Sequence, residues 1–367
     1  MKAAIITLHT VANYGTQLQA LATQKKLEEY FEEVEFIDYR RKDTYGIGLL
    51  KSFAKGNPLR AAAALPSIIY WKYIFGDFRK KNLKIGKKTY FEQRDFEDFK
   101  DDADVYLVGS DQVWNSGWNK GVIPAMYLNF IPQTKPKYTY SSSFGRSSLK
   151  KEEVQETYSL IHQFSRISVR EESGLDILKD QYHYPNGIRI VDPTLAMDAD
   201  FWRSKAVRKK TIKEKYILIY NLNRSKEFDD YCKKIAQKTG YTLYRFCTRF
   251  DQIFRNGKSL VIPEILEFIN FIDDAELVIT DSFHATAFAM NMNTEPICIY
   301  PNDYSGRISE FLKLVEAEQR HAVDFDDMDV LERRTDFKKV NQILEEERKR
   351  TDVFLKQVLL EVKSDEK

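Results

Sequence analysis

Cysteine and histidine are both scarce in this chain of 367 residues, with three and five copies. Cys232, Cys247 and Cys298 form no Cys-x-x-Cys pair and lie beside no histidine cluster, which argues against a zinc site or a disulfide framework. Scattered thiols fit a reducing compartment. The sequence also lacks a His-x-x-x-His motif and paired metal carboxylates, so we expect no bound metal and no cofactor.

Long apolar runs are absent as well. Because no stretch approaches the roughly 18 apolar residues that a membrane-spanning helix needs, we expect no such helix. The apolar run at 1–8 is too short for a secretion signal. Together with the thiols, these absences predict a cytoplasmic protein. The net charge of +2 gives no indication of a nucleic-acid partner.

Two glycine motifs are missing from the places where they would identify a function. The first strand–helix–strand unit has no Gly-x-Gly-x-x-Gly, so a dinucleotide site is not indicated. The chain has no Gly-x-Ser-x-Gly, which argues against an α/β-hydrolase.

The hydrophobic pattern that is present alternates between strand and helix. Apolar runs at 2–8 and 34–39 flank a segment of helical periodicity at 16–31, which is a βαβ unit. Further predicted strands lie at 105–108, 137–141, 167–169, 188–191, 216–221, 243–247, 277–280 and 296–300. The pattern predicts an α/β fold with two doubly wound domains and a cleft between them.

Composition suggests where these domains begin and end. We expect an N-terminal domain over 1–196, a charged linker at 197–215 and a C-terminal domain over 216–336. The remaining residues, 337–367, form a long charged helix and a tail that could return to the first domain.

A basic and aromatic helical insertion interrupts the first domain at about 47–94. The segment from 51 to 94 contains eleven lysines and arginines but only two acidic residues, and tyrosine, tryptophan and isoleucine are interleaved with them. Such a segment can lie on an anionic bilayer, which would place the protein at the inner face of the membrane. Alternatively, its apolar side packs on its own domain or on a second subunit.

The segment 277–286 carries the sharpest functional signal. A β-branched run ends in Thr280-Asp281-Ser282, and a helical pattern begins at once, so His284 falls in the first turn of a helix. Ligands of open α/β sheets bind at this edge, and a helix N-terminus favours anions and a neutral imidazole. His284 is therefore a candidate acid–base group, with Asp281 beside it. The alternative is a histidine that only hydrogen-bonds its own loop.

Polar residues also follow the strand at 105–108. Ser110, Asp111 and Gln112 are candidate ligands of an acceptor, and Trp114 offers a flat apolar wall. Alternatively, Asp111 caps a helix and Trp114 belongs to the core.

The loop after the first strand ends in Asn13-Tyr14-Gly15, at the same edge of the same sheet. Its backbone N–H groups could hold an anion or a sugar hydroxyl. Thr16 could equally be a simple helix cap.

Three arginines are candidate ligands of an anion. Arg170 directly follows a strand, where a guanidinium can grip phosphate or carboxylate with two hydrogen bonds. The alternative is a salt bridge to Glu171 or Asp192. Arg146 ends a loop of small residues, and Arg307 opens the last helix of the second domain.

These motifs, taken in order, resemble the polysaccharide pyruvyl transferase family. The resemblance runs from the N-terminus to about residue 314 and rests on seven segments: 13–15, 109–115, 143–145, 167–171, 191–195, 280–284 and 305–308. It implies a fold similar to GT-B glycosyltransferases, with two Rossmann-like domains facing across a cleft. It also implies transfer of pyruvate from phosphoenolpyruvate onto two hydroxyls of a sugar as a cyclic ketal, in capsule, exopolysaccharide or cell-wall synthesis in the bacterial cytoplasm. The acceptor would be a sugar or a lipid-linked oligosaccharide.

The resemblance also implies roles for single residues. His284 matches the acid–base histidine of the family, and Arg170 matches an arginine that would hold the donor. Several pyruvyl transferases carry arginine two residues before the histidine, where this chain has Ser282. Serine donates a hydrogen bond but brings no charge, so Arg307 or Arg146 would have to compensate, or the donor differs.

Two other functions remain open on the sequence. One is a GT-B glycosyltransferase that uses a nucleotide sugar, for which Glu310 is a faint candidate ribose ligand. The other is a non-enzymatic binding protein of the same family, suggested by Ser282. The oligomeric state is not encoded in these patterns.

Overall fold

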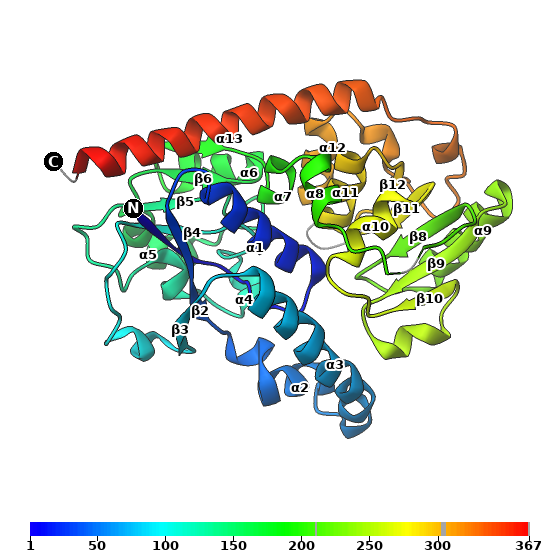
Figure 1. Cartoon of the computed structure of the whole chain (residues 1–367), viewed down its shortest axis with the longest axis horizontal. Helices are drawn as coiled ribbons and strands as arrows, with labels where there is room; N and C mark the ends of the chain where they lie inside the picture. Colours follow the sequence, from blue (N-terminus) through cyan, green and yellow to red (C-terminus); the bar gives the residue numbers. More distant parts are fainter. Residues whose placement is uncertain (210, 302–305, 366–367) are drawn as a thin grey trace. The chain divides into compact units, whose positions relative to one another are not determined.

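A computed structural model of the chain describes residues 1–209, 211–301 and 306–365 (Figure 1). The chain folds into two compact units. Unit 1 contains residues 1–49, 77–196 and 346–367, and unit 2 contains residues 50–76 and 197–345. None of the helices among the described residues is long and apolar enough to cross a membrane.

Unit 1 is built on a parallel five-stranded sheet. The strands, in spatial order, are β3 (Ile85–Tyr90), β2 (Glu33–Tyr39), β1 (Lys2–Ile6), β4 (Val105–Val108) and β5 (Lys137–Thr139). β4 and β5 are buried along their whole length, and β4 (Val-Tyr-Leu-Val) is accordingly apolar or aromatic throughout, whereas β5 contains the polar residues Lys137 and Thr139. A second parallel pair, β6 (Ile167–Val169) and β7 (Gly187–Arg189), follows. The strand order reverses between β1 and β4.

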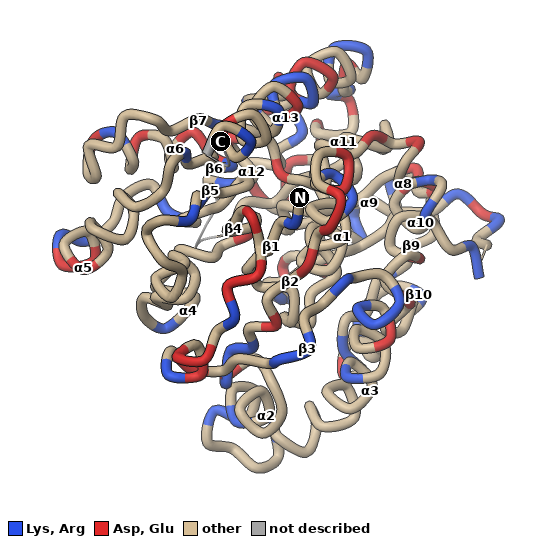
Figure 2. The backbone as a smooth tube through the Cα atoms, turned by 60° about the vertical axis from the view of Figure 1, so that its left-hand side comes forward, with Lys and Arg blue, Asp and Glu red and all other residues tan. Residues whose placement is uncertain are grey.

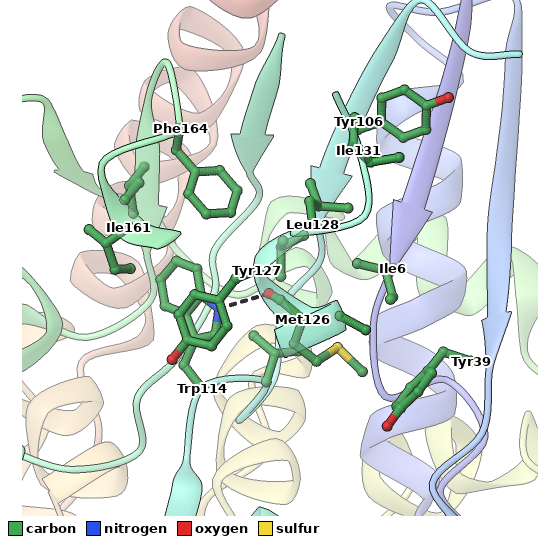
Figure 3. Packing of buried hydrophobic residues seen from close by; sticks show 14 of the residues in the cluster. Ile6, Tyr39, Tyr106, Trp114, Met126, Tyr127, Leu128, Ile131, Ile161 and Phe164 are labelled. Atoms are coloured by element: carbon green, nitrogen blue, oxygen red, sulfur yellow. Dashed lines mark hydrogen bonds between the residues drawn. The ribbon is translucent and has the colours of Figure 1, made fainter. Parts of the chain in front are cut away.

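Helices cover this sheet and fill its core. They are α1 (Tyr14–Leu27), α4 (Ser116–Asn119), α5 (Lys151–Ile161), α6 (Glu172–Asp176) and α7 (Pro193–Ala196). α1 is buried almost all around, because it packs on the sheet and contacts α7. The core of the unit gathers aromatic and aliphatic side chains from β1, β4 and the loops that follow β4 (Figure 3).

Unit 2 repeats the same topology. Its parallel sheet has the order β10 (Lys258–Val261), β9 (Thr242–Cys247), β8 (Tyr216–Tyr220), β11 (Leu277–Thr280) and β12 (Pro296–Cys298). Its helices include α8 (Ala199–Lys205), α9 (Lys226–Thr239), α10 (Glu267–Asp273), α11 (Phe283–Met292) and α12 (Gly306–Leu314). The strand order reverses between β8 and β11, so both units are Rossmann-like.

The division between the units falls inside two long helices and inside the short helix at 46–54, whose residues 50–54 belong to unit 2. α3 (Pro58–Asn82) begins in unit 2 and ends in unit 1, and α13 (Phe337–Asp365) does the same. α2 (Gly46–Ala54) precedes α3. The last turns of α13 are fixed to unit 1, because Glu361 accepts hydrogen bonds from Tyr138 and Arg166, and Asp352 pairs with Lys26.

Besides shifts of a few residues at the ends of several helices and strands, the observed elements differ from the predicted ones in three respects. β3 and β10 were not predicted, since both are edge strands whose side chains are largely solvent-accessible. The charged segment 197–215, predicted as a linker, contains the helix α8. The predicted insertion at 47–94 is divided: residues 50–76 belong to unit 2, whereas β3 completes the sheet of unit 1.

Candidate active site

The reversal of strand order in unit 1 brings together the loops after β1 and β4, which is where open α/β sheets bind ligands. Asn13 caps α1 by accepting a hydrogen bond from the backbone N–H of Thr16 at 3.2 Å. The hydroxyl of Thr16 donates to Asp111 Oδ2 at 2.7 Å. The two motifs predicted to share one edge of the sheet are thus joined by a direct hydrogen bond. Tyr14 and Gly15 are buried in the first turn of α1.

Asp111 has an unusual backbone. Its φ of 76° lies in the left-handed region, which only a minority of non-glycine residues adopt. The carboxylate partly compensates, because Oδ1 accepts the backbone N–H of Gln112 at 2.9 Å. Strain of this kind is concentrated at functional sites, so the loop after β4 is a candidate ligand site.

Ser110 and Arg170 belong to a buried ionic network beneath this loop. The hydroxyl of Ser110 donates to Asp192 Oδ2 at 3.0 Å, and Nη1 of Arg170 donates to the same oxygen at 2.7 Å. Nε of Arg170 donates to Glu171 Oε1 at 2.9 Å. Asp111 approaches the same guanidinium at 4.0 Å.

The surroundings of Arg170 therefore favour the salt-bridge alternative. Burial would lower the pKa of Arg170, but the charges of Glu171, Asp192 and Asp111 raise it overall. One cation among three carboxylates leaves the cluster with a negative balance. Such a cluster is poorly suited to binding a phosphate or carboxylate, so the geometry gives little support to donor binding by Arg170.

Trp114 lies in the core of unit 1. Its ring stacks on Tyr127 at 5.3 Å between centroids, and its Nε1 donates to the carbonyl of Met126 at 2.9 Å (Figure 3). The side chain is 1% exposed, so it offers no wall to a ligand. Gln112 lies closer to the surface of the loop and accepts a hydrogen bond from Asn115 at 2.5 Å.

Arg146 follows Gly145, whose φ of 64° and close approach to Gln112 exclude a side chain. Nη1 of Arg146 lies 3.4 Å from the hydroxyl of Ser116 and 3.6 Å from Glu153 Oε2. Its side chain is partly exposed, so Arg146 is a more accessible cation than Arg170.

The corresponding reversal in unit 2 joins the loops after β8 and β11. Asp281, at the end of β11, accepts the backbone N–H groups of Leu222 and Asn223 at 2.6 and 2.7 Å. Burial raises the pKa of the Asp281 carboxyl, while these two N–H groups oppose the rise. Asp281 thus ties the loop after β8 to the segment that carries His284.

His284 lies in the first turn of α11, as the sequence predicts. Ser282 is the N-cap, and its hydroxyl accepts the backbone N–H of Ala285 at 3.5 Å. The ring of His284 is 7% exposed and lies 5.3 Å from the ring of Phe283. A helix N-terminus disfavours a charged imidazole, so this position suits a histidine that accepts and donates a proton.

Arg307 lies in the first turn of α12 and is half-buried. Residues 303–305 of the motif that precedes it lie outside the described residues. Glu310 is on the same helix.

A cluster of four arginines in unit 2 was not anticipated from the sequence. Arg224 follows β8, Arg245 lies in β9, and Arg249 and Arg255 flank the segment that leads to β10. The available signal was the position of 221–225 directly after a buried strand, the same signal that identified the loops after β1, β4 and β11. Among the described residues, no group of His, Cys, Asp and Glu could hold a metal ion.

Comparison with known structures supports the fold. UDP-GlcNAc 2-epimerase from Neisseria meningitidis, bound to UDP-GlcNAc, has a TM-score of 0.55 at 12% identity over 99% of each chain. The epimerase from Rickettsia bellii has a TM-score of 0.54 at 12% identity, covering 99% of this chain and 96% of its own. An α-glucosyltransferase in complex with UDP and DNA has a TM-score of 0.51 at 10% identity, covering 97% and 95%. The chain therefore has a GT-B-like fold.

Sequence comparison identifies the family. No curated protein matches the chain. The family described as polysaccharide pyruvyl transferase matches residues 13–303, which include the loop after β4 in unit 1 and the His284 segment of unit 2. A match over this much of the chain indicates a transferase-type enzyme of polysaccharide biosynthesis, and we conclude that the chain belongs to the polysaccharide pyruvyl transferase family.

Proposed function

We propose that the protein transfers pyruvate from phosphoenolpyruvate to two hydroxyls of a sugar, forming a ketal in surface polysaccharide synthesis. The observation that carries the proposal is the position of His284 at the N-terminus of α11, where the strand order of unit 2 reverses. The family match supports a role for this position in pyruvyl transfer, because the matched residues include His284.

The reaction requires one proton at C3 of the enol. Protonation of C3 creates an electrophilic C2, which one sugar hydroxyl attacks. The second hydroxyl then displaces phosphate from C2, so two C–O bonds form, one C–O bond breaks and inorganic phosphate leaves. The hydroxyls lose two protons in total, of which one balances the proton gained by C3 and the other leaves with phosphate. In this proposal, His284 donates and accepts these protons.

The acceptor would bind at polar groups of the loops after β1 and β4. Asn13, Ser110, Asp111 and Gln112 supply side-chain oxygens and amides that could hydrogen-bond sugar hydroxyls. Asp111 and Ser110 are already engaged with Thr16 and Asp192, which fixes their orientation. Ser282 would contribute a hydroxyl to the donor, and Arg307 and Arg146 are the candidate cations beside Arg170.

Phosphate release tests the proposal. Purified protein is incubated with phosphoenolpyruvate and a panel of nucleotide-linked and lipid-linked sugars, and inorganic phosphate and a ketal product are measured together. We expect stoichiometric phosphate and ketal with one acceptor class. Ketal formation that is absent with every acceptor, while UDP is released from a nucleotide sugar, would contradict the proposal.

A nucleotide-sugar glycosyltransferase is the second candidate. Two of the similar structures were solved with UDP-GlcNAc or UDP bound, and their fold resembles that of this chain. The phosphate assay separates the two functions, because a glycosyltransferase releases UDP and leaves phosphoenolpyruvate unchanged.

We further propose that α2 and α3 contact an anionic membrane surface, which would give access to a lipid-linked acceptor. One side of α3 is buried and includes Trp71, which donates to the carbonyl of Thr248 at 2.7 Å. The other side exposes a row of apolar residues: Leu59 at 78%, Ile69 at 62% and Tyr73 at 69%. Exposed lysines at 51, 55, 72, 80 and 81 accompany this row. Apolar and cationic groups together match the chemistry of an anionic bilayer.

Vesicle sedimentation tests this contact. The full chain should bind phosphatidylglycerol vesicles more tightly than phosphatidylcholine vesicles, and Ile69→Glu/Tyr73→Glu should reduce binding at least tenfold. A matched control, Val353→Glu/Leu360→Glu, changes two exposed apolar residues of α13 and should bind as the wild type does. Equal sedimentation of both variants would show that α3 does not contact the membrane.

A further inference from the structure

The carboxyl edge of the sheet in unit 2 carries an excess of positive charge. Among the residues that the structure describes, four arginines, at 224, 245, 249 and 255, are paired with two carboxylates, those of Asp229 and Asp251. Arg245 is fully buried and pairs with Asp229 at 2.6 Å, and Arg255 approaches the second oxygen of Asp229 at 3.2 Å. The first carboxylate is therefore shared by two cations.

The second carboxylate is also committed. Arg249 donates from Nε and Nη2 to the two oxygens of Asp251, at 2.7 and 2.5 Å. Arg224 reaches the same group only at 3.5 Å. After this pairing, the cluster retains two uncompensated positive charges, and Arg224 has the weakest partner.

The contacts of Arg224 leave much of its hydrogen-bonding capacity unused. Its Nη2 lies 3.5 Å from the hydroxyl of Thr248, at the limit of a hydrogen bond. Its Nε is buried and has no hydrogen-bond partner among the described residues. The side chain is 21% exposed, so it is accessible to a ligand without being fully solvated.

The electrostatic environment agrees with this geometry. Burial lowers the pKa of Arg224, and the charges of Arg249, Arg255 and Arg245 lower it further, against the opposing effect of Asp251. A bound anion would offset both the burial of the guanidinium and the repulsion by the neighbouring arginines. It supplies the missing negative charge and the missing hydrogen-bond acceptors.

The backbone places Arg224 where an anionic substrate is expected. Arg224 follows β8 and precedes the N-cap of α9, Ser225, whose hydroxyl accepts the N–H of Phe228 at 3.1 Å. β8 and β11 are hydrogen-bonded neighbours, about 4.8 Å apart. Asp281 joins their following loops, so Arg224 and His284 border the same edge of one sheet.

Residues of α2 and α3 contact the segment 248–250, which carries Arg249. Besides the bond from Trp71 to the carbonyl of Thr248, the hydroxyl of Ser67 accepts the N–H of Phe250 at 3.0 Å. The guanidinium of Arg249 lies 5.3 Å from the ring of Phe53. Contacts from α2 and α3 thus fix the segment 248–250, which preorganises the arginines for a ligand.

From these observations we infer that Arg224, supported by Arg249 and Arg255, forms a binding site for the phosphoryl group of an anionic substrate. Its identification as the donor site for phosphoenolpyruvate rests on the proposed function. The site supplies the positive charge that Ser282 lacks, from the strand next to the one that precedes Ser282.

Equilibrium titration of the full-length protein tests this site with three probes: phosphoenolpyruvate, UDP and inorganic phosphate. Arg224→Gln should weaken binding of the favoured probe at least tenfold, and Arg224→Lys should restore part of it. Lys226→Gln is the matched control, because Lys226 lies two residues away, is 83% exposed and pairs with Asp230. We expect this control to bind within twofold of the wild type, and thermal unfolding verifies that each variant is folded.

The outcomes separate this inference from the proposed function. If phosphoenolpyruvate fails to bind but UDP or phosphate binds in an Arg224-dependent way, the anion site stands and the donor assignment falls. If the wild type forms the ketal and Arg224→Gln binds phosphoenolpyruvate with unchanged affinity, the inference is wrong although the function stands. Equal losses of affinity in Arg224→Gln and Lys226→Gln would show that binding depends only on the overall charge, which would overturn the site. Absence of binding by all three probes would overturn it as well.

Discussion

At the scale of single residues, His284 combines three properties that proton transfer requires. It lies at a helix N-terminus, it is largely shielded from solvent, and it neighbours the loop that Asp281 joins to β8. Shielding strengthens electrostatic interactions with a bound anion, and the helix dipole favours the neutral imidazole. These properties suit a group that protonates the enol of a donor.

Replacement of His284 by glutamine should therefore lower turnover by about 10²–10⁴-fold, which is the usual contribution of general acid–base catalysis. The amide keeps hydrogen-bonding capacity but transfers no proton. Phosphate release with saturating donor measures the effect, and circular dichroism monitors folding. A folded variant with nearly wild-type turnover would remove His284 from the reaction.

Arg170 has a different character, because its guanidinium is buried among Glu171, Asp192 and Asp111. Arg170→Met should leave these carboxylates without a counter-ion and destabilise the protein by about 3–5 kcal/mol. Arg146→Met, which removes a partly exposed pair with Glu153, should cost about 1 kcal/mol or less. Urea unfolding measures both. Equal stability of the two variants would show that the Arg170 network is not structural.

Sequence patterns placed the candidate residues at strand ends, as the structure has them, but did not settle the environment of every side chain. The positions of Asn13, Asp111 and His284 followed from strand ends, which periodicity reveals. The burial of Trp114 and the carboxylates around Arg170 depend on chain segments far apart in sequence, so local patterns left both alternatives open. The arginines of unit 2 come together only when β8, β9 and the segment before β10 are assembled.

At the scale of secondary structure elements, the buried strands were the most predictable. β4, β6 and β11 have the predicted bounds, because all of their residues face a packed interior. The edge strands β3 and β10 lack this signal, since backbone pairing with β2 and β9 defines them. In α8 a capping interaction of Asp198 with the N–H of Phe201 outweighs the charged composition.

A buried lysine in strand β5 predicts how the stability of the protein depends on pH. Lys137, at its start, is buried, and its Nζ donates to the carbonyl of Ile131 and to Gln163. Burial lowers the pKa of Lys137 to about 8, below the usual 10.5. Between these values the unfolded chain binds more protons than the folded chain, so the contribution of Lys137 to stability increases as the pH rises.

Urea unfolding of the wild type and of Lys137→Met across this pH range isolates the contribution. The free energy of unfolding of the wild type should rise relative to that of the variant between about pH 8 and 10. Tyrosine ionisation affects both proteins and is removed by the comparison. Parallel curves would show that Lys137 titrates as it does in the unfolded chain.

At the scale of the whole molecule, the net charge is near neutral, and lysines and arginines are interspersed with acidic residues over most of the chain (Figure 2). Two exceptions are the arginine cluster of unit 2 and the lysines of α2 and α3. Alternating strands and helices correctly predicted two Rossmann-like domains. The boundaries were harder to predict, because α3 and α13 each contribute to both units and no change in composition marks the crossing.

We propose that this protein uses phosphoenolpyruvate as its donor. Calorimetric titration of the wild-type protein with phosphoenolpyruvate, beside UDP- and GDP-sugars, tests it most directly. We predict saturable binding of phosphoenolpyruvate and no comparable binding of the nucleotide sugars. Saturable binding of a nucleotide sugar, with no heat from phosphoenolpyruvate, would contradict the account and identify a glycosyltransferase.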